Sequence, residues 1–349
     1  MKKVIYTLSF AALAASASAQ VVSSTQIYVS EGAVLSVGQD FENKGELINK
    51  GELHLRQNLK NDGELRSEGS VVFDGYRPQE VNGTNDVQLA SATVENDVNL
   101  NTPMVIGRTM NYNQGVVSSS DNSPLVFAAD ANHFGASDYS HSVGTVTKLE
   151  ANQFEFPLGD GANYRGFNAR SQKGSALSAA YIAQNPNEFS GELANGVESI
   201  NDQEYWVLTS NDENEEADVR LINTYETNVA YLKRNTWTIA ENRTLDKTSG
   251  LDKGVRFTSG RGKLVKKDIG VWPNPTQGDF NLKLAGMNDK DDVMIDVTNQ
   301  DGRIVLSMKG KVSDLRKVYS LPQSLVTTEL TVRVINGEDV LTEKLILNR

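Results

Sequence analysis

The stretch NKGELINKGEL, residues 43–53, contains the same five letters twice, six residues apart. The period extends beyond this duplication. Eight consecutive positions at a spacing of six are apolar: Val29, Leu35, Phe41, Leu47, Leu53, Leu59, Leu65 and Val71. A helix would not keep a period of six, because its neighbouring positions lie three, four and seven residues apart. An even period keeps one face of an extended chain, so the stretch predicts short β-strands.

The residues between the apolar positions complete the pattern. Charged residues follow most of the apolar ones by three positions, and glycine precedes four of them by two, at Gly45, Gly51, Gly63 and Gly69. Short strands joined by glycine-assisted turns are typical of a β-solenoid or a stacked β-meander. We therefore predict one column of apolar side chains in which the two NKGEL copies are successive rungs. The glycines would make the turns, and the lysines and glutamates would face solvent.

Two functional interpretations of the hexads are weaker. A calcium-binding repeat needs aspartates in register beside the glycines, and only Asp62 and Asp74 approximate this pattern. Left-handed β-helix acyltransferases also use hexads, but they need a catalytic histidine at a coil interface, for which His54 is the candidate in the hexad region. We expect neither activity.

The first 19 residues have the three parts of a secretory signal peptide. Lys2 and Lys3 form the basic start, residues 4–15 are apolar, and residues 17–19 are small enough for a signal peptidase. Cleavage after Ala19 would leave Gln20 at the new N-terminus. The apolar run is too short to span a membrane, and no later run of 18 apolar residues follows. The sequence therefore predicts a secreted protein without a transmembrane segment.

Composition narrows the classes of function. The net charge is -11, and loss of Lys2 and Lys3 with the signal peptide would make it about -13. An acidic chain lacks the basic surface that nucleic acids require, so we expect no nucleic-acid partner. The chain has no cysteine, so a secreted form must be held together by its core and by backbone pairing.

Apolar segments typical of strands continue after residue 73, and no segment before residue 150 has the pattern of an amphipathic helix. The expected strands are 87–89, 98–100, 104–106, 116–117 and 125–127, separated by turn-forming residues. We expect a β-repeat region over residues 20–150.

The composition changes near residue 150, and most of the aromatic residues lie after this point. Alternating segments at 205–208, 219–222 and 229–232 indicate a β-sandwich over residues 151–267. Tyr205, Trp206, Tyr231 and Trp237 could stack on sugars if exposed, although core packing is the simpler expectation. The acidic run 211–216 lacks the spacing of a calcium loop, so we expect a solvated loop.

We find no catalytic motif. With three histidines and no cysteine, pairs of nucleophile and base are scarce. His133 and His141, with Asp130 and Asp138, could be assembled into a metal site, but a polar surface loop is the simpler interpretation. We therefore expect no enzyme activity, no cofactor and no metal site. A hydrolase whose carboxylates are scattered over loops is a further alternative.

The last 80 or so residues follow the pattern of a small antiparallel sandwich. A strand ending at Trp272 leads into Pro273-Asn274-Pro275, a glycine at Gly278 and a new strand at Phe280. Further strands are expected at 293–297, 303–306, 318–321, 330–334 and 344–347, with turns at 299–302 and 336–337.

This segment, residues 268–349, resembles the type A C-terminal sorting domain of proteins exported by the type IX secretion system of Bacteroidota. The resemblance is carried by the P-N-P-x-x-G-x-F opening, the D-G-R turn and the K-L-I-L ending. The corresponding residues are Pro273, Asn274, Pro275, Gly278, Phe280, Asp301, Gly302, Arg303 and Lys344. The resemblance implies recognition by the outer-membrane translocon, and removal of the domain as the cargo is released or joined to surface lipopolysaccharide. The stretch 325–330 lacks the Gly-x-Tyr usual before the penultimate strand, which leaves the processing of the domain open.

The sequence thus predicts an all-β, secreted or cell-surface protein. Its parts would be a signal peptide (1–19), a solenoid-like region (20–150), a β-sandwich (151–267) and a sorting domain (268–349). The expected function is structural or interactive, in adhesion, surface assembly or as an accessory to gliding motility. The translocon is the expected partner, and other surface proteins or an adhesin are further candidates. The alternatives are a carbohydrate-binding protein and a secreted hydrolase.

Overall fold

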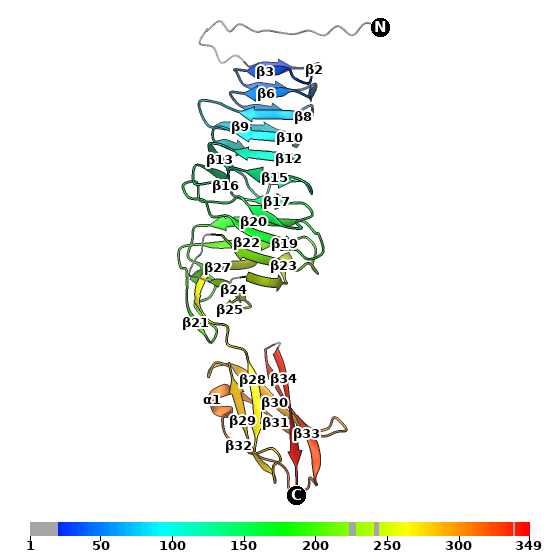
Figure 1. The fold of residues 1–349 in the computed structure, drawn as a ribbon, viewed down its shortest axis with the longest axis vertical. Coiled ribbons are helices and arrows are strands. Elements are labelled where there is room, and N and C mark those ends of the chain that lie inside the picture. The colour runs from blue at the N-terminus through cyan, green and yellow to red at the C-terminus, as the bar shows by residue number, and fades with distance from the viewer. Residues whose placement is uncertain (1–19, 223–227, 241–243, 338) are drawn as a thin grey trace. The chain divides into compact units, whose positions relative to one another are not determined.

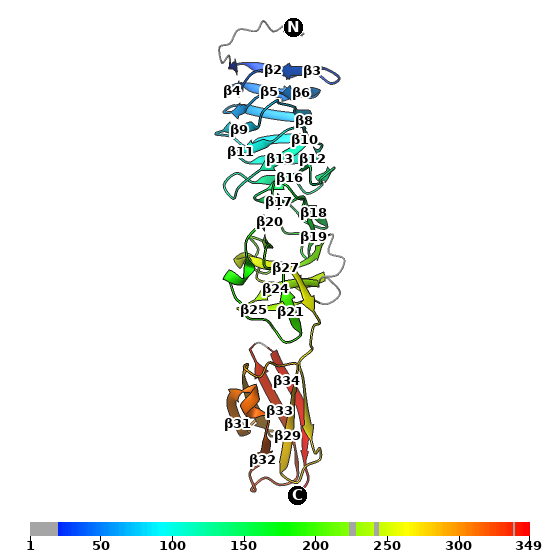
Figure 2. The same ribbon diagram turned by 90° about the vertical axis from the view of Figure 1, so that its left-hand side faces the viewer.

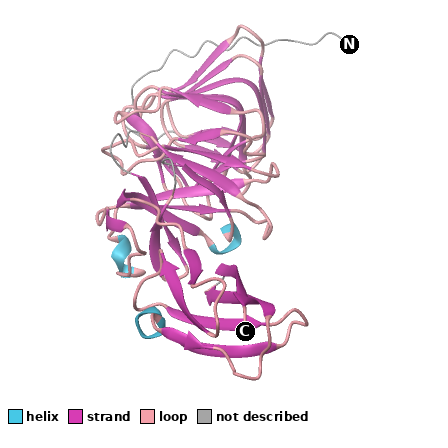
Figure 3. Ribbon diagram, turned by 60° about the horizontal axis from the view of Figure 1, so that its bottom comes forward, coloured by secondary structure: helices cyan, strands magenta, loops and turns pink. Residues whose placement is uncertain are grey.

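The computed structural model describes residues 20–222, 228–240, 244–337 and 339–349, in which nearly every regular element is a strand (Figure 3). The helices described are the single-turn α1 (Val312–Leu315) and the 3-10 turns η1 (Pro186–Glu188) and η3 (Leu251–Lys253). The all-β prediction is confirmed. The chain divides into two compact units. The first comprises residues up to 183 with 206–222 and 247–255; the second comprises 184–205, 223–246 and 256–349.

The first unit begins with a parallel β-solenoid, whose coils stack in chain order (Figures 1 and 2). One sheet contains β1 (Val21–Ser23), β4 (Phe41–Asn43), β7 (Leu59–Asn61), β9 (Gln79–Gly83), β11 (Val98–Leu100), β13 (Gly115–Ser118) and β16 (Ser140–Val143), in that order. The other follows β2 (Gln26–Val29), β5 (Glu46–Asn49), β8 (Glu64–Phe73), β10 (Val87–Val94), β12 (Met104–Tyr112), β14 (Leu125–Phe127) and β17 (Val146–Lys148). Beside them, β3 (Val34–Val37) pairs with β6 (Glu52–Leu55), β6 with β8, and β15 (Asn132–Phe134) with β12.

The hexads form three columns and not the single column that we predicted. Leu47 pairs with Leu65, 18 residues further along, and Leu53 pairs with Val71 at the same spacing. Phe41 pairs in the same way with Leu59. Three hexads therefore make one coil, and the two NKGEL copies lie on neighbouring faces of that coil. The predicted core is correct for seven of the eight positions, since all except Leu35 are buried.

The glycines of the hexads are required by close approach between coils, which differs from the turn role that we predicted. A Cβ on Gly51 would lie 2.2 Å from the carbonyl oxygen of Ala33, and one on Gly69 would lie 2.0 Å from that of Gly51. The backbone hydrogen bonds between coils continue here, with Ser70 N donating to Gly51 O at 2.9 Å. A side chain cannot fit where two backbones approach this closely.

Buried asparagines precede these glycines and join successive coils. Asn43 donates through Nδ2 to Asn61 Oδ1 at 2.9 Å and to Glu64 O at 3.0 Å. Asn49 donates to Ser67 Oγ at 3.1 Å and to Ser70 O at 2.9 Å. These side chains satisfy carbonyls at the corners that would otherwise be buried without a partner. The N-x-G phrase is thus a corner in which asparagine faces inward and glycine admits the next coil.

Parallel pairing ends at β17, which pairs in the antiparallel direction with β20 (Leu177–Ile182). A second antiparallel sheet contains β18 (Phe154–Phe156), β19 (Phe167–Ser171) and β23 (Ala217–Leu221), in that order. In this region the first unit also contains residues 206–209 of β22 (Tyr205–Thr209) and residues 247–248 of β26 (Thr244–Thr248). The strands that we predicted at 205–208 and 219–222 are confirmed.

The second unit begins with a group of antiparallel strands. There β27 (Val255–Gly262) lies between β21 (Val197–Ile200) and β24 (Asn228–Lys233), and β24 pairs with β25 (Thr236–Ile239). Ala230, Trp237 and Ile239 form its buried core.

The C-terminal part of the second unit, residues 268–349, is a sandwich of two antiparallel sheets. One has the order β28 (Asp268–Trp272), β29 (Asp279–Ala285), β32 (Val318–Ser320). The other has the order β31 (Ile304–Lys311), β30 (Asp292–Thr298), β33 (Thr328–Asn336), β34 (Asp339–Leu347). Their inward side chains, including Phe280, Ile295, Val332 and Leu345, form one hydrophobic core. The predicted strands of this segment are all present.

Candidate functional site

The P-N-P-x-x-G segment binds the last strand of the C-terminal sandwich. The side chain of Asn274 makes two backbone hydrogen bonds with β34, donating to Lys344 O at 2.7 Å and accepting from Ile346 N at 2.9 Å. Thr276 continues the pairing, since its N–H donates to Ile346 O and its carbonyl accepts from Asn348 N, both at 2.8 Å. Pro273 and Pro275 flank Asn274, and both follow cis peptide bonds. The opening and the ending of the sequence signature are therefore parts of one contact.

Gly278 and Phe280 complete the opening for different reasons. Gly278 has a φ of 142°, which favours glycine, and a Cβ there would lie 2.5 Å from a guanidinium nitrogen of Arg349. The Phe280 ring is fully buried and stacks on the ring of Tyr319, with centroids 5.3 Å apart. Gly278 is thus selected by backbone geometry, and Phe280 by the core.

Arg349 was missed in the sequence and connects two loops, one between β28 and β29 and one between β32 and β33. Its guanidinium donates to the carbonyls of Gln277 at 3.0 Å, Pro322 at 2.8 Å, Leu325 at 3.1 Å and Leu321 at 3.2 Å. An arginine fork has several fixed donors and suits a cluster of carbonyls. A lone basic residue at the end of a strand carries no sequence signal for this role.

A groove of about 800 Å³ lies at this end of the sandwich. Its lining comes from the proline segment, the start of β29, the end of β32 and the loop after it: Pro273, Pro275, Thr276, Gln277, Gly278, Asp279, Ser320, Leu321, Gln323 and Arg349. Most of these residues have polar side chains, so the groove can offer hydrogen bonds to a partner. It also offers one carboxylate, that of Asp279.

The D-G-R turn lies at the same end of the sandwich. The register pairs Thr298 with Thr331 and Thr328 with Leu347, which places residues 299–303 at the same end of the sheet as the end of β34, with β33 between them. Asn299 closes the turn by accepting Arg303 N through Oδ1 at 2.9 Å, and Gly302 has a φ of 76°. Asp301 and Arg303 are exposed.

Lys344 is the remaining residue of the signature. Its ammonium is exposed and lies 2.5 Å from Glu329 Oε2, while its carbonyl accepts the bond from Asn274. The stretch 325–330, which lacks Gly-x-Tyr, forms the loop whose Thr327 bonds with the backbone of Arg349 and the start of β33. Ala19, the expected cleavage residue, lies outside the described residues. Gln20 is described, and it donates to Glu42 Oε2 at 3.2 Å.

His54 lies on the surface of the solenoid between two carboxylates. Its Nδ1 is 2.9 Å from Asp74 Oδ2 and its Nε2 is 2.7 Å from Glu52 Oε1. Partial burial lowers the pKa of His54, but the two carboxylates outweigh this and hold it above its usual value. Both ring nitrogens are thus occupied, and the arrangement is an ion-pair cluster.

The four residues considered as a metal site do not come together. His141 is buried, with Nδ1 2.9 Å from Ser137 O and Nε2 accepting from Gly161 N at 3.0 Å. His133 packs edge-on against the rings of Tyr112 and Phe154, and burial lowers its pKa. Asp138 accepts from Tyr164 N at 2.7 Å. Within the described ranges, no group of three or more His, Cys, Asp or Glu residues is arranged to hold a metal ion.

The acidic run 211–216 contains a buried residue, which our prediction of a solvated loop missed. Glu215 Oε1 accepts the backbone N–H groups of Gln172 at 2.9 Å, Lys173 at 3.1 Å and Glu216 at 3.1 Å. Burial opposes the charge, but hydrogen bonds from Ser175 and the backbone outweigh it and lower the pKa of Glu215. The carboxylate therefore fixes this loop.

Lys148 is a second buried charge without a sequence signal. Its ammonium donates to three carbonyls, those of Ala128 at 2.6 Å and of Ala129 and Ala131 at 2.7 Å. Burial lowers its pKa. All three donors are used, so the residue stabilises the loop that follows β14.

The aromatic residues considered for sugar stacking are mostly core. Trp237, Trp206 and Tyr205 are buried, and Tyr231 is half-buried. Trp206 Nε1 donates to Arg165 O at 2.7 Å and Trp237 Nε1 to Ser190 O at 3.0 Å. These rings do not form an exposed platform, which leaves the carbohydrate-binding interpretation without the residues on which it depended.

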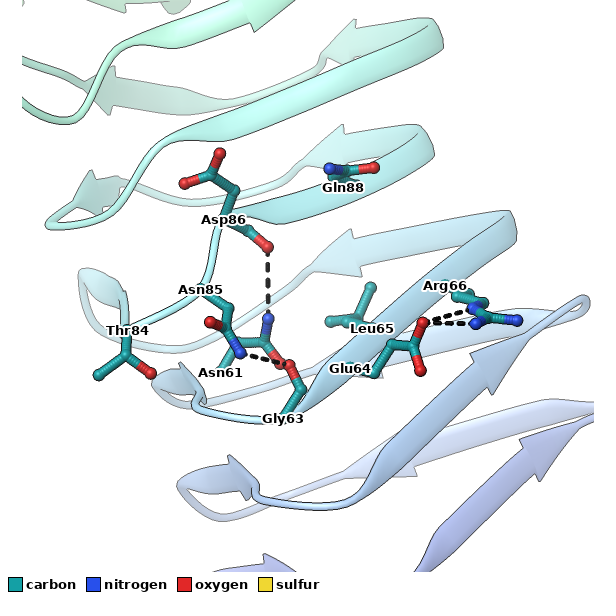
Figure 4. Close-up of a pocket in the computed structure, with 9 residues that line it drawn as sticks. All are labelled: Asn61, Gly63, Glu64, Leu65, Arg66, Thr84, Asn85, Asp86 and Gln88. Atoms are coloured by element: carbon teal, nitrogen blue, oxygen red, sulfur yellow. Dashed lines mark hydrogen bonds and ion pairs between the residues drawn. The ribbon is translucent and has the colours of Figure 1, made fainter.

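A second groove, of about 620 Å³, lies at a solenoid corner between β8 and the turn that precedes β10 (Figure 4). Asn85 Nδ2 donates to Gly63 O at 2.9 Å, Asn61 Nδ2 to Asp86 O at 3.3 Å, and Arg66 pairs with Glu64 at 2.5 Å. These contacts join neighbouring coils at the corner.

The comparisons with known proteins concern the C-terminal sandwich. The family model "Secretion system C-terminal sorting domain" matches residues 270–348. No curated protein matches the chain. Among solved structures, the β-glucuronidase of Faecalibacterium prausnitzii is similar at 10% identity and a TM-score of 0.20, over 49% of this chain and 37% of that one. The chain thus spans little more than a third of that enzyme, and the likeness supports no inference. In the described part of the chain, no helix is long and apolar enough to cross a membrane.

Proposed function

Residues 270–348 are a type IX secretion C-terminal sorting domain, as found in Bacteroidota, and we propose that this secreted protein acts at the cell surface as a structural or interaction protein. The sorting domain engages the secretion machinery, and the solenoid is the part that works after export. The roles we propose for it are adhesion, surface assembly or support of a larger adhesin, including in gliding. A further part of the proposal is that the chain is not an enzyme.

The observation that carries the proposal is the regularity of the solenoid. Its inward positions are filled by core residues and by asparagines that bond to the next coil. Its outward positions carry alternating charges in surface ion pairs, such as Lys50 with Glu68 at 3.0 Å and Lys60 with Asp62 at 2.8 Å. A stack of this kind offers a long, stiff lateral surface, which suits a spacer or a binding face.

The positions of the signature residues support a recognition face on the sorting domain. The P-N-P segment, the D-G-R turn and the end of β34 all lie at one end of the sandwich. We propose that this end, with its groove of about 800 Å³, is the face that the translocon recognises.

Deletion of residues 268–349 tests export. The truncated protein is expected to remain inside the cell, whereas a Lys44→Ala variant, altered only at an exposed solenoid side chain, should reach the surface or medium normally. Normal export of the truncated protein would overturn the sorting assignment.

Attachment and spreading of a strain that lacks the whole protein test the surface role. Unchanged behaviour in both assays would count against adhesion and gliding.

The non-enzymatic part needs a separate experiment. The secreted protein is incubated with a panel of surface and plant polysaccharides, and new reducing ends are measured. We expect no release above that of a heat-denatured sample. Release that depends on folded protein would establish a hydrolase instead.

A further inference from the structure

The first coil of the solenoid has an open edge. Strands β1, β2 and β3 each pair on one side, with β4, β5 and β6, and within the described residues no strand pairs with their other side. The opposite end of the solenoid is covered, because β17 pairs with β20. Unpaired backbone groups along an edge strand are a template for pairing with another chain.

The apolar columns are also open at this edge. Val21 is in register with Phe41, Ile27 with Leu47, and Leu35 with Leu53. The second-coil members are buried, yet Val21 is 42% exposed and Ile27 and Leu35 are half-exposed. Leu35 is half-exposed because its column is open at this edge, whereas Val29, also in the first coil, is in register with Asn49 and is buried. Three more apolar residues of the first coil are exposed: Val22 by 46%, Tyr28 by 55% and Val34 by 65%.

The first coil lacks the charges that protect other edge strands. Residues 20–39 contain one charged residue, Glu31, whereas residues 40–60 contain eight. Lysines and other charges on an edge normally prevent association, because pairing would bury them. Their absence leaves an apolar, hydrogen-bonding surface of about one coil in area.

We propose that this edge is an interface between two copies of the chain, stacked first coil against first coil about a two-fold axis. A two-fold contact is self-complementary, so each copy supplies the strand edges and apolar side chains that the other lacks. The chain carries a net charge of -11, which opposes association through most of its surface. The first coil brings one glutamate from each copy, so charge repulsion is weakest there.

The test is the mass of the secreted chain in solution, measured by sedimentation over a range of concentrations. The wild-type protein should be a dimer, and a Val22→Lys/Val34→Lys variant should dissociate about 10-fold more readily, because the lysines of the two copies would bring like charges together across the contact. Both positions are exposed in the single chain, so folding should be unaffected, which circular dichroism checks. Val326→Lys/Val340→Lys is the matched control, with equal added charge at exposed positions of the sorting domain, and it should remain a dimer.

Three results would overturn the proposal: a monomeric wild-type protein at about 100 µM, far above the dissociation constant of a specific dimer, an equally tight dimer in the Val22→Lys/Val34→Lys variant, and dissociation in the control. Binding of the open edge to a different surface protein would appear as the first of these. None of these results affects the proposed export, which depends on residues 268–349.

Discussion

The solenoid and the C-terminal sandwich are both β-structures, but they place their informative residues differently. In the solenoid the same chemistry recurs every 18 residues, as in the pair Asn43 and Asn61, and each copy contacts only the coils before and after it. In the sandwich each signature residue has a unique contact, as when Asn274 bonds to β34 some 70 residues away. Because the solenoid repeats, each of its contacts joins only neighbouring coils. The sandwich instead depends on single contacts between residues far apart in the chain.

The largest expected effect is in the sandwich. Phe280→Ala should destabilise it by about 4 kcal/mol, because a fully buried ring stacked on Tyr319 leaves a cavity. Compared with the wild-type chain, the variant should exchange its amide hydrogens faster throughout β28–β34. Exchange in the solenoid should be unchanged. Val326→Ala, at a position 75% exposed, is the control and should change little. Exchange confined to β29 would show that the sandwich is not cooperative.

A glycine substitution makes the matching test in the solenoid. Gly51→Ala should cost about 3 kcal/mol, because its Cβ would lie 2.2 Å from Ala33 O and would push two coils apart. Gly38→Ala is the control, since its Cβ would meet no atom within 4 Å. Thermal unfolding of both variants gives the comparison. Equal melting temperatures would contradict the close-approach explanation.

The asparagine corners should contribute somewhat less. Asn49→Ala removes three hydrogen bonds, two to the next coil and one accepted from Gly51 N, and leaves Ser70 O without this donor, at a cost of about 2 kcal/mol. Faster exchange should be concentrated in β5, β6 and β8. Asn101→Ala serves as the control, because Asn101 is exposed and bonds to Asn82 at the surface. A uniform loss of protection across the solenoid would argue against the local contacts described above.

Asn274→Ala should have a smaller effect on stability, about 1 kcal/mol, because the two bonds to β34 are exposed to water. The amide of Ile346 should exchange faster. Asn281→Ala, which loses one long bond of 3.5 Å to Trp272 O, is the control. If Asn274→Ala blocks export although β34 remains protected, Asn274 is read by the machinery and is more than a structural residue.

The smallest effect concerns His54 and pH. Its pKa is raised above the usual 6.5 in the folded chain by Glu52 and Asp74, so the protonated ring stabilises the fold. This stabilisation is fully present below pH 6.5 and is lost as the pH rises through the folded pKa. Relative to His54→Gln, the wild-type solenoid should gain under about 1 kcal/mol at low pH and nothing at high pH. Arg56, whose Nε lies 3.6 Å from Asp74, reduces the gain. A larger advantage at high pH would reverse the assignment.

The secondary structure and the all-β fold class could be predicted from the sequence, because they depend on local patterns. The hexads predicted strands and buried positions, and the apolar segments between turn residues located the strands of the sandwich, β28–β34. The signature residues from Pro273 to Phe280 were recognisable in the same way. The groove around them and the role of Arg349 were not, since they arise where residues far apart in the chain meet.

The sequence by itself determined that NKGELINKGEL is extended and has leucine inside and charge outside, because a period of six keeps one face of a strand. Only the tertiary structure decided that Leu47 and Leu53 lie on different faces, since hexad length does not specify how many hexads make a coil. The same holds for Gly51 and Asn49. Their roles depend on the coil stacked 18 residues away, and it is the approach of that backbone that excludes a side chain and requires a hydrogen bond.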